Sequence, residues 1–327
     1  MNIVFEIQGG IGKNVVATVI VELLRKKYPK DTLIVITDAK DVFVNNPHID
    51  DLFSFEERLD ALDKYVHHQL DNCIIFVKNV YQESDFITGK GNIYEVWAKM
   101  YDLEYNGEKP KLYLSDEEEL KFGDSLKENN GEFFHLADGN YIGGLTMPKE
   151  NTNMVGKKPI LLIHPHGGAL QKSEDVQLIS HYVKPLNYNW SRDLPINLTK
   201  RIIKEYKDTY DIFYIKHPSQ PQTFQGATPA DGSIRDIILL LLKSDKRILI
   251  DSFAQHLAAA LDLPSTVCWV TTNPKSFGYD IHNNIIAKRP EFITDMSCYN
   301  GYNLVEPLHN IPYSSTANIF NLNQIIK

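Results

Sequence analysis

The chain has few cysteines and no long hydrophobic run. Its three cysteines, Cys73, Cys268 and Cys298, are an odd number and lack the spacing of a metal site. This excludes a disulfide scaffold and is typical of a reducing cytoplasm. The longest purely aliphatic run, Ile237–Leu242, is six residues long, whereas a helix that crosses a bilayer needs about 20. No signal peptide is visible, so we expect a cytoplasmic protein that contacts a membrane at most peripherally.

Several motifs that carry chemistry are also missing. The chain has no Walker sequence, which excludes a P-loop, and no Gly-x-Ser-x-Gly elbow, so a hydrolase triad finds no support. It holds no Asp-x-Asp pair, the usual means of holding a metal–diphosphate through two close carboxylates. The spacing His164-x-His166 occurs in zinc sites, but no cysteine or carboxylate cluster accompanies it. We therefore expect no metal, and both histidines to be phosphate contacts or plain loop residues.

The composition indicates a folded protein with a sizeable core. Hydrophobic residues make up 43% of the 327 positions and charged residues 23%, and this length suits about two domains. The net charge of −8 argues against broad contact with nucleic acid, although a local basic groove would still allow a nucleic acid as a substrate.

Hydrophobic patterning predicts an α/β protein with parallel sheets and helices on both faces of each sheet. A linker rich in Gly, Asn, Lys and Pro is expected over 143–159. Strands are expected at Asn2–Ile7, Leu33–Thr37, Cys73–Val77, Glu132–Leu136, Ile160–Ile163, Ile212–Ile215, Arg247–Ile250 and Ser265–Val270. Helices are expected at Lys13–Lys27, Glu117–Leu126, Pro195–Tyr206, Ile234–Leu242 and Ser314–Lys327, the last capped by Ser314 or Ser315.

Both halves of the chain begin with a strand that runs into a Gly-Gly loop. The first loop is Gly9–Gly12 and the second is His164–Ala169. Since ligands of α/β proteins bind outside the carboxyl ends of strands, these loops predict a cleft between two domains. The first loop is not a complete dinucleotide fingerprint, because Val15 stands where a third glycine is expected, so a nicotinamide cofactor is disfavoured.

Residues 250–264 are the most informative stretch. Asp251 and Ser252 follow a strand and are good N-cap residues for a helix rich in small side chains. His256 lies one turn after Ser252, so both can face one ligand. A helix start presents unpaired N–H groups to an anion. The pattern therefore indicates a phosphate or diphosphate seat, although many α/β proteins carry such a unit without a ligand.

Several segments form an ordered series. They are Gly10–Gly12 with Leu23–Pro29, Asn46–Leu52, Lys109–Ser115, Ile163–Gly168, Trp190–Pro195, and Asp251-Ser252 with His256–Leu261 and Pro264. Together they resemble segments of the family 9 glycosyltransferases, the group that includes the ADP-heptose:lipopolysaccharide heptosyltransferases. The closest match is to "DSG-xx-HLAAAL-xx-P", and the resemblance covers residues 3 to about 275.

The resemblance implies a GT-B fold, in which two Rossmann-like domains face each other across a cleft. Residues 1–155 would form the acceptor-side domain and 156–327 the nucleotide-sugar-binding domain, with a last helix able to cross back to the first. It also implies an inverting, metal-independent transfer of a sugar to a hydroxyl acceptor, by default a saccharide of lipopolysaccharide type. The donor diphosphate would contact Asp251, Ser252, Phe253, His256, His166, Gly167 and Gly168, and the acceptor-side loop would include Gly10, Gly12 and Asp38.

The chain departs from the family pattern in two places. The family carries its Asp general base directly after the Gly12 position, where this chain has Lys13. A lysine replaces that base only if its pKa is strongly lowered, and it could instead bind an acceptor phosphate or carboxylate. We expect Asp138 to be the base, with Asp38 and Asp41 as alternatives. The usual glycine after Asp-Ser is Phe253, which would reshape the donor pocket.

Other readings stay open. In the long stretch 171–189, Lys172 or Lys184 could reach the donor phosphates. Lys216-His217-Pro218 resembles the His-Pro motif of bacterial sialyltransferases, which keeps His217 and a CMP-sugar donor in consideration. A modified DNA base is an alternative acceptor. A sugar-nucleotide epimerase, or a sugar-nucleotide-binding protein without catalysis, would also fit the scaffold, because a fold does not fix a function.

Overall fold

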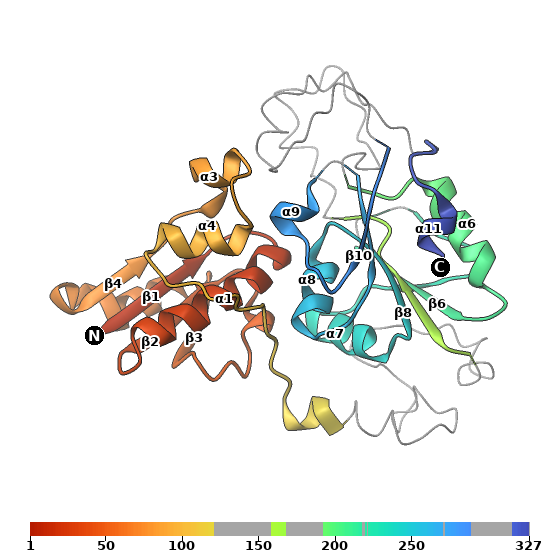
Figure 1. Cartoon of the computed structure of the whole chain (residues 1–327). Coiled ribbons are helices and arrows are strands. Elements are labelled where there is room, and N and C mark those ends of the chain that lie inside the picture. The colour runs from red at the N-terminus through yellow and green to blue at the C-terminus, as the bar shows by residue number, and fades with distance from the viewer. Residues whose placement is uncertain are drawn as a thin grey trace, which may run out of the picture.

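The structure is a computed structural model that describes residues 1–120, 158–167, 192–217, 220, 222–270, 272–288 and 316–326. Its strands form two separate parallel sheets, which Figure 1 shows side by side with helices between and around them. The α/β architecture expected from the sequence is thereby confirmed.

The first sheet has four strands in the order β3-β2-β1-β4. They are β1 (Asn2–Ile7), β2 (Thr32–Thr37), β3 (Asp51–Ser54) and β4 (Cys73–Phe76). The helices of this half are α1 (Ile11–Lys27), α2 (Arg58–Leu62), α3 (Ser84–Ile87) and α4 (Ile93–Met100). Short helical turns lie at Lys40–Val42, Asp63–His67, Leu70–Asn72 and Val80–Gln82.

The second sheet has six strands in the order β10-β9-β8-β5-β6-β7. They are β5 (Ile160–Ile163), β6 (Asp211–Ile215), β7 (Thr228–Ala230), β8 (Lys246–Ile250), β9 (Thr266–Trp269) and β10 (Asn283–Ile286). The helices are α6 (Ile196–Tyr206), α7 (Ile234–Lys243), α8 (Phe253–Ala260), α9 (Pro274–Phe277) and α11 (Leu322–Ile325).

The strand order of the second sheet reverses at β5. The chain runs outward from β5 through β6 to β7, and then returns to the other side of β5 to add β8, β9 and β10. The loops that follow β5 and β8 therefore leave the sheet in opposite directions and open a crevice between them. Such a switch point is the usual ligand site of an open parallel sheet.

A continuous hydrophobic cluster joins the two sheets. It contains buried residues of β1 and α1 together with residues of β5, α7 and α8. Two further clusters cover the outer faces, one on each sheet. In Figure 1, α1 of the first half and α8 of the second lie against each other between the sheets. The halves thus pack through these two helices.

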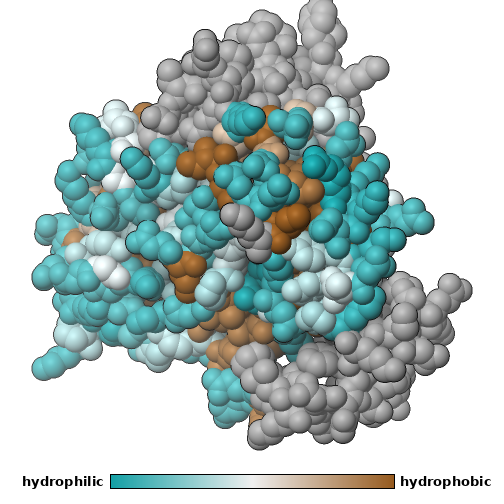
Figure 2. All heavy atoms as spheres, turned by 45° about the vertical axis from the view of Figure 1, so that its right-hand side comes forward, coloured by the Kyte–Doolittle hydropathy of each residue, from teal (hydrophilic) through white to brown (hydrophobic). Residues whose placement is uncertain are grey.

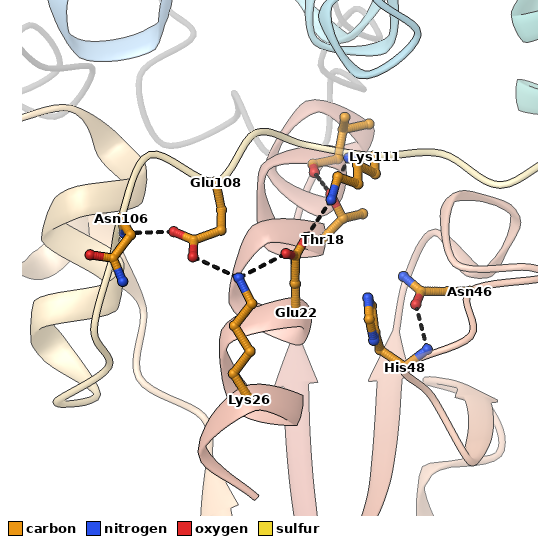
Figure 3. Close-up of polar contacts among 9 residues, drawn as sticks. Thr18, Glu22, Lys26, Asn46, His48, Asn106, Glu108 and Lys111 are labelled. Atoms are coloured by element: carbon orange, nitrogen blue, oxygen red, sulfur yellow. Dashed lines mark hydrogen bonds and ion pairs between the residues drawn. The ribbon is translucent and has the colours of Figure 1, made fainter. Parts of the chain in front are cut away.

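The passage that leaves the first half, residues 106–111, contacts α1 through ion pairs and a hydrogen bond (Figure 3). The Lys26 ammonium contacts Glu22 at 2.9 Å and Glu108 at 2.7 Å, and Lys111 contacts Glu22 at 3.0 Å. The Lys111 N–H also donates to the Thr18 hydroxyl. These ion pairs lower the pKa of Glu22, against an opposing effect of burial that is the largest single contribution. The passage is therefore held against the helix that begins at the Gly9–Gly12 loop.

Most expected elements are present with boundaries within two residues, but the expected C-terminal helix is wrong. It spans only Leu322–Ile325, and its cap is Asn321, whose side chain accepts the Asn323 N–H. The possible crossing of this helix to the first half is also wrong. The Tyr206 hydroxyl donates to the Ile326 carbonyl, so α11 lies on α6 of the second half.

Some expectations fall on residues that are not described. The strand at Glu132–Leu136, most of the linker at 143–159 and the domain boundary at 155/156 lie there. In contrast, β3, β7 and β10 are present without having been expected. Their sequences, DLFS, TPA and NNII, hold at most two adjacent large apolar residues, so no apolar run indicates a strand there.

On the face shown in Figure 2, hydrophilic residues predominate and hydrophobic residues gather in a few patches. Among the described residues, no helix is long and apolar enough to span a membrane.

Candidate active site

A cavity of about 570 Å³ lies between the two halves, at the carboxyl ends of β1 and of the second sheet. The first half contributes the start of α1 and Tyr81. The second half contributes the ends of β5, β6, β7 and β8 and the starts of α7 and α8. Of the residues singled out from the sequence, Gly10, Gly12, Lys13, His166, His217, Asp251, Ser252, Phe253 and His256 line it.

The start of α8 forms one wall of this cavity. Ser252 is the N-cap residue, as expected, but its side chain makes no capping hydrogen bond to the helix. Among the described residues, no acceptor binds the N–H groups of Phe253 and Ala254. Orphan N–H groups at a helix start are suited to an anion. Phe253, in the place of the family's glycine, packs its ring edge-on against His164 at a centroid distance of 5.0 Å.

His256 is buried at the boundary between the halves. It is 6% exposed, and burial lowers its pKa from 6.5 to about 3, aided by the charges of His282 and Arg192. It is therefore neutral at physiological pH. Its Nδ1 lies 2.8 Å from the Tyr279 hydroxyl. A Cβ added to Gly12 would lie 2.9 Å from His256 Cδ2, so the absence of a side chain at Gly12 lets α1 approach this ring.

Asp193 contacts the loop after β5 through both of its carboxylate oxygens. One carboxylate oxygen of Asp193 lies 3.1 Å from His166 Nδ1, and the other accepts the Gly167 N–H at 2.9 Å. The His166 ring stacks on Phe224 at a centroid distance of 5.7 Å. His166 and Asp193 are both buried, so the loop has a fixed geometry at the cavity edge.

Two more buried polar residues, His164 and Asp251, belong to the cavity wall formed by the second half. His164 is 1% exposed, and among the described residues its Nδ1 has no hydrogen-bond partner. Burial lowers the pKa of His164 to about 3. Burial also raises the pKa of Asp251, against the opposing charge of Arg192 and a hydrogen bond from Thr272. Since buried polar atoms nearly always have a partner, the wall is suited to a polar ligand.

The opposite wall carries a buried cation. Lys13 is 9% exposed, and its Nζ donates to the Gln8 carbonyl at 2.9 Å and to Asn79 Oδ1 at 3.1 Å. Nζ also lies 5.4 Å from the Tyr81 ring centroid and 5.6 Å from the Trp97 ring centroid. Burial lowers the pKa of Lys13 from 10.5 to about 8, while the charge of Asp38 opposes this shift.

Asp38 contacts the glycine loop of the first half but does not line the cavity. It lies at the end of β2, and its carboxylate accepts the Gly9 N–H at 2.9 Å. Gly9 has a φ of +119°, a conformation that glycine adopts at little cost. Asp38 therefore holds the glycine loop in place, and it is not among the residues that line the cavity.

Four candidates lie outside the described residues: Asp138, Gly168, Lys172 and Lys184. Gly167 is described, and although it does not line the cavity, a Cβ there would lie 3.3 Å from the Ser252 hydroxyl oxygen. Gly167 thus lets the loop after β5 approach the start of α8.

Sequence reasoning missed several residues of the site. Arg192 and Asp231 line the cavity, and Asp193 and Tyr279 hold its histidines. Arg192-Asp193 lies just before an expected helix, so this position could have indicated both residues. Asp231 follows β7, a strand that the sequence did not indicate, so it carried no such signal. Nothing in the sequence around Tyr279 links it to His256, 23 positions away.

Among the described residues, no group of three or more His, Cys, Asp or Glu side chains could hold a metal ion. In this part of the chain, His164 and His166 therefore do not belong to a group of three potential metal ligands. Metal independence remains a prediction.

Comparison with solved structures identifies the fold. A glycosyltransferase of family 9 from Veillonella parvula is 12% identical, with 99% of this chain and 94% of that chain covered and a TM-score of 0.60. The chain has the fold of the family 9 glycosyltransferases. Escherichia coli ADP-heptose LPS heptosyltransferase II is 12% identical, with coverage of 95% and 96% and a TM-score of 0.55.

TibC of enterotoxigenic E. coli, an iron-containing dodecameric glycosyltransferase, is 10% identical, with coverage of 99% and 71% and a TM-score of 0.56. TibC has also been solved in complex with ADP-D-β-D-heptose. No family model matches the sequence, and no curated protein matches it. The expected fold, GT-B with two Rossmann-like units, is confirmed over nearly the whole chain.

Proposed function

We propose that this chain is a glycosyltransferase that moves a sugar from a nucleotide-sugar donor to a hydroxyl acceptor. The observation that carries the proposal is the cavity at the switch point of the second sheet, where the start of α8 and the loop after β5 meet the glycine loop of the first half. Switch points are where such folds bind nucleotides. The fold shared with family 9 supports the same class of reaction.

The donor diphosphate is assigned to the wall of the second half. The Phe253 and Ala254 N–H groups and the neutral His256 ring can donate hydrogen bonds to phosphate oxygens. Fixed donors of this kind stabilise charge that develops on a leaving group without a metal ion. His166, Gly167, Gly168 and Lys172 complete the proposed donor contacts on the loop after β5.

The reaction we propose inverts the anomeric centre. The acceptor hydroxyl oxygen attacks the anomeric carbon, and the bond from that carbon to the phosphate oxygen breaks. Its electron pair leaves with the nucleotide, and a carboxylate takes the acceptor proton. Asp138 remains our proposed base. Asp231 is the natural comparison, since it is an exposed carboxylate that lines the cavity.

For Lys13 we propose contact with the acceptor, by default a saccharide of lipopolysaccharide type. No carboxylate lies within ion-pair distance of its Nζ among the described residues. Asp38 acts on Lys13 only through its charge at longer range, and a buried cation without a contacting carboxylate favours an anionic group. Lys13 is thus suited to a carboxylate or phosphate on the acceptor.

A CMP-sugar donor is the second candidate. Lys216 and His217 line the cavity, which supports a role for the segment that resembles the sialyltransferase His-Pro motif. The His217 N–H donates to Gln220 Oε1 at 3.0 Å, which fixes the turn that presents this pair.

A thermal-shift screen with ADP-, UDP-, GDP- and CMP-sugars tests the donor assignment. We expect stabilisation by one nucleotide class in the wild type and its loss in Ser252→Trp, because the indole would fill the seat beside the start of α8. Stabilisation by none of the sugars, or an unchanged response in Ser252→Trp, would contradict the assignment.

Turnover of a labelled nucleotide sugar with and without acceptor then separates the possible activities. Release of nucleotide only with acceptor supports transfer. An epimerised sugar nucleotide would indicate an epimerase, and tight binding without turnover a binding protein. In an active enzyme, Asp138→Asn should lower kcat at least 100-fold, whereas Asp231→Asn should leave it within a few-fold.

A further inference from the structure

Tyr279 contacts His256 in a way that decides where the imidazole carries its proton. Its hydroxyl oxygen lies 2.8 Å from His256 Nδ1, and the two rings meet edge-on at 82° with centroids 5.6 Å apart. Both residues are buried, and burial keeps the phenol protonated by raising its pKa well above 10. A neutral imidazole has one N–H, and the hydrogen bond at one nitrogen determines which nitrogen carries it.

The second polar group near this ring does not compete. The Gln255 amide nitrogen lies 3.2 Å from His256 Nδ1 and 3.0 Å from its Nε2. An atom this close to both nitrogens lies over the ring face, because in the ring plane it would overlap Cε1. The amide is therefore aimed at neither in-plane lone pair, and it donates to the Phe277 carbonyl.

The chemistry of the pair sets the direction of the hydrogen bond. A phenol is a good donor and a poor acceptor, whereas the unprotonated imidazole nitrogen is a good acceptor. The Tyr279 O–H therefore donates to Nδ1, and the imidazole proton lies on Nε2. The Nε2–Cδ2 edge is the one that faces Gly12 at the cavity.

We propose that Tyr279 is a positioning residue that holds neutral His256 in the Nε2–H form, so that an N–H donor faces the phosphate oxygens of a nucleoside diphosphate in the cavity. This inference rests on the proposed donor site for its ligand, but the tautomer itself does not. Without the Tyr279 hydroxyl, part of the population carries the proton on Nδ1 and presents a lone pair, which repels an anion.

The backbone before Tyr279 supports a fixed position. A Cβ on Gly278 would lie 2.6 Å from the Pro274 carbonyl oxygen, so only glycine allows this tight exit from α9. From the first half, the Tyr94 ring lies against Tyr279 at a centroid distance of 5.8 Å. The hydroxyl is thus placed by both halves of the molecule.

The experiment uses the full chain with isotope-labelled histidine and NMR of the ring nitrogens, the His256 signals being assigned with His256→Ala. In the wild type we expect an unprotonated Nδ1 and a protonated Nε2. Tyr279→Phe, which removes only the hydroxyl, should shift both signals toward a mixture of the two forms. A protonated Nδ1 in the wild type, or unchanged signals in Tyr279→Phe, would overturn the proposal.

A binding cycle tests the consequence with ADP as the probe. Tyr279→Phe should raise the Kd for ADP about tenfold, the loss of one charge-assisted hydrogen bond, and should add nothing in a His256→Ala background. Equal weakening in both backgrounds would mean that Tyr279 does not act through His256. If ADP does not bind the wild type, the proposed donor site is wrong. The NMR signals of the His256 ring nitrogens then still test whether Tyr279 sets the tautomer.

Tyr206→Phe is the matched control. It also removes a buried tyrosine hydroxyl, which donates to the Ile326 carbonyl in the second half, and Tyr206 is not a cavity residue. We expect it to lower stability while leaving the His256 signals and the Kd for ADP unchanged.

Discussion

The two walls of the cavity are built differently. The wall of the second half presents several buried polar side chains, including His166 held by Asp193 and His256 held by Tyr279. The wall of the first half presents a glycine loop and a single buried cation, Lys13, bound by the Gln8 carbonyl and Asn79. In the second half, pairs of side chains fix the wall. In the first half, the wall consists of the glycine loop and the ammonium group of Lys13.

This difference indicates that the two walls bind different ligands. A dense set of fixed donors suits a ligand with several phosphate oxygens, whereas a glycine loop and one cation suit a ligand that is bound at fewer points. The family's Asp is also replaced on the Lys13 side, so the chemistry specific to this chain is expected on the first wall. Four changes test this comparison.

Asp193→Ala should have the largest effect on stability. It leaves the Gly167 N–H and His166 Nδ1 without their acceptor in a buried loop. We expect the free energy of unfolding to fall by about 3 kcal/mol, measured by denaturant titration. A loss below about 0.5 kcal/mol would mean that the second wall does not depend on this pair.

Lys13 should make stability rise with pH. Its pKa is about 8 in the folded chain and near 10.5 when unfolded, so between these values the unfolded chain holds a proton that the folded chain releases. The cost of burying the charge is complete below pH 8 and is relieved as the pH rises toward 10.5.

We expect Lys13→Met to remove up to about 3 kcal/mol of this pH dependence. The measurement is the difference in free energy of unfolding between wild type and variant at several pH values. A pH-independent difference would show that Lys13 is not desolvated.

Gly12→Ala and Gly10→Ala form a matched pair at the junction of the walls. A Cβ at Gly12 would lie 2.9 Å from His256 Cδ2, whereas one at Gly10 has no atom within 4 Å. Gly12→Ala should cost about 2 kcal/mol and disturb His256, while Gly10→Ala should be nearly neutral. Equal effects of the two changes, compared by denaturation and by the ring-nitrogen signals, would contradict the contact.

Arg235→Met should have the smallest effect. From the start of α7, Arg235 pairs with Glu118 and donates to the Asp41 and Tyr113 carbonyls of the first half. We expect a loss of about 1 kcal/mol in denaturant titration, because the group is half-buried and several bonds share one side chain. Lys99→Met, which removes an exposed pair with Asp85, is the control and should change little.

Much of the architecture was predictable from local pattern. The strands before both Gly-Gly loops and the helices α1, α6 and α7 follow from hydrophobic periodicity. The placement of Ser252 and His256 one turn apart follows from helix geometry, and both line the cavity. The short strands β7 and β10 and the truncated α11 were not predictable, because pairing with neighbours decides them.

The sequence by itself determined the α/β class, the two glycine loops and the candidate helix start, since each depends on residues close together in the chain. Only the tertiary structure decided that Asp193 holds His166, that Tyr279 holds His256, and that Lys13 is a buried cation facing them. These contacts join residues 5 to 66 positions apart, and no local pattern encodes them. Their pKa values and hydrogen bonds come from burial, which exists only once the two halves have packed around the cavity.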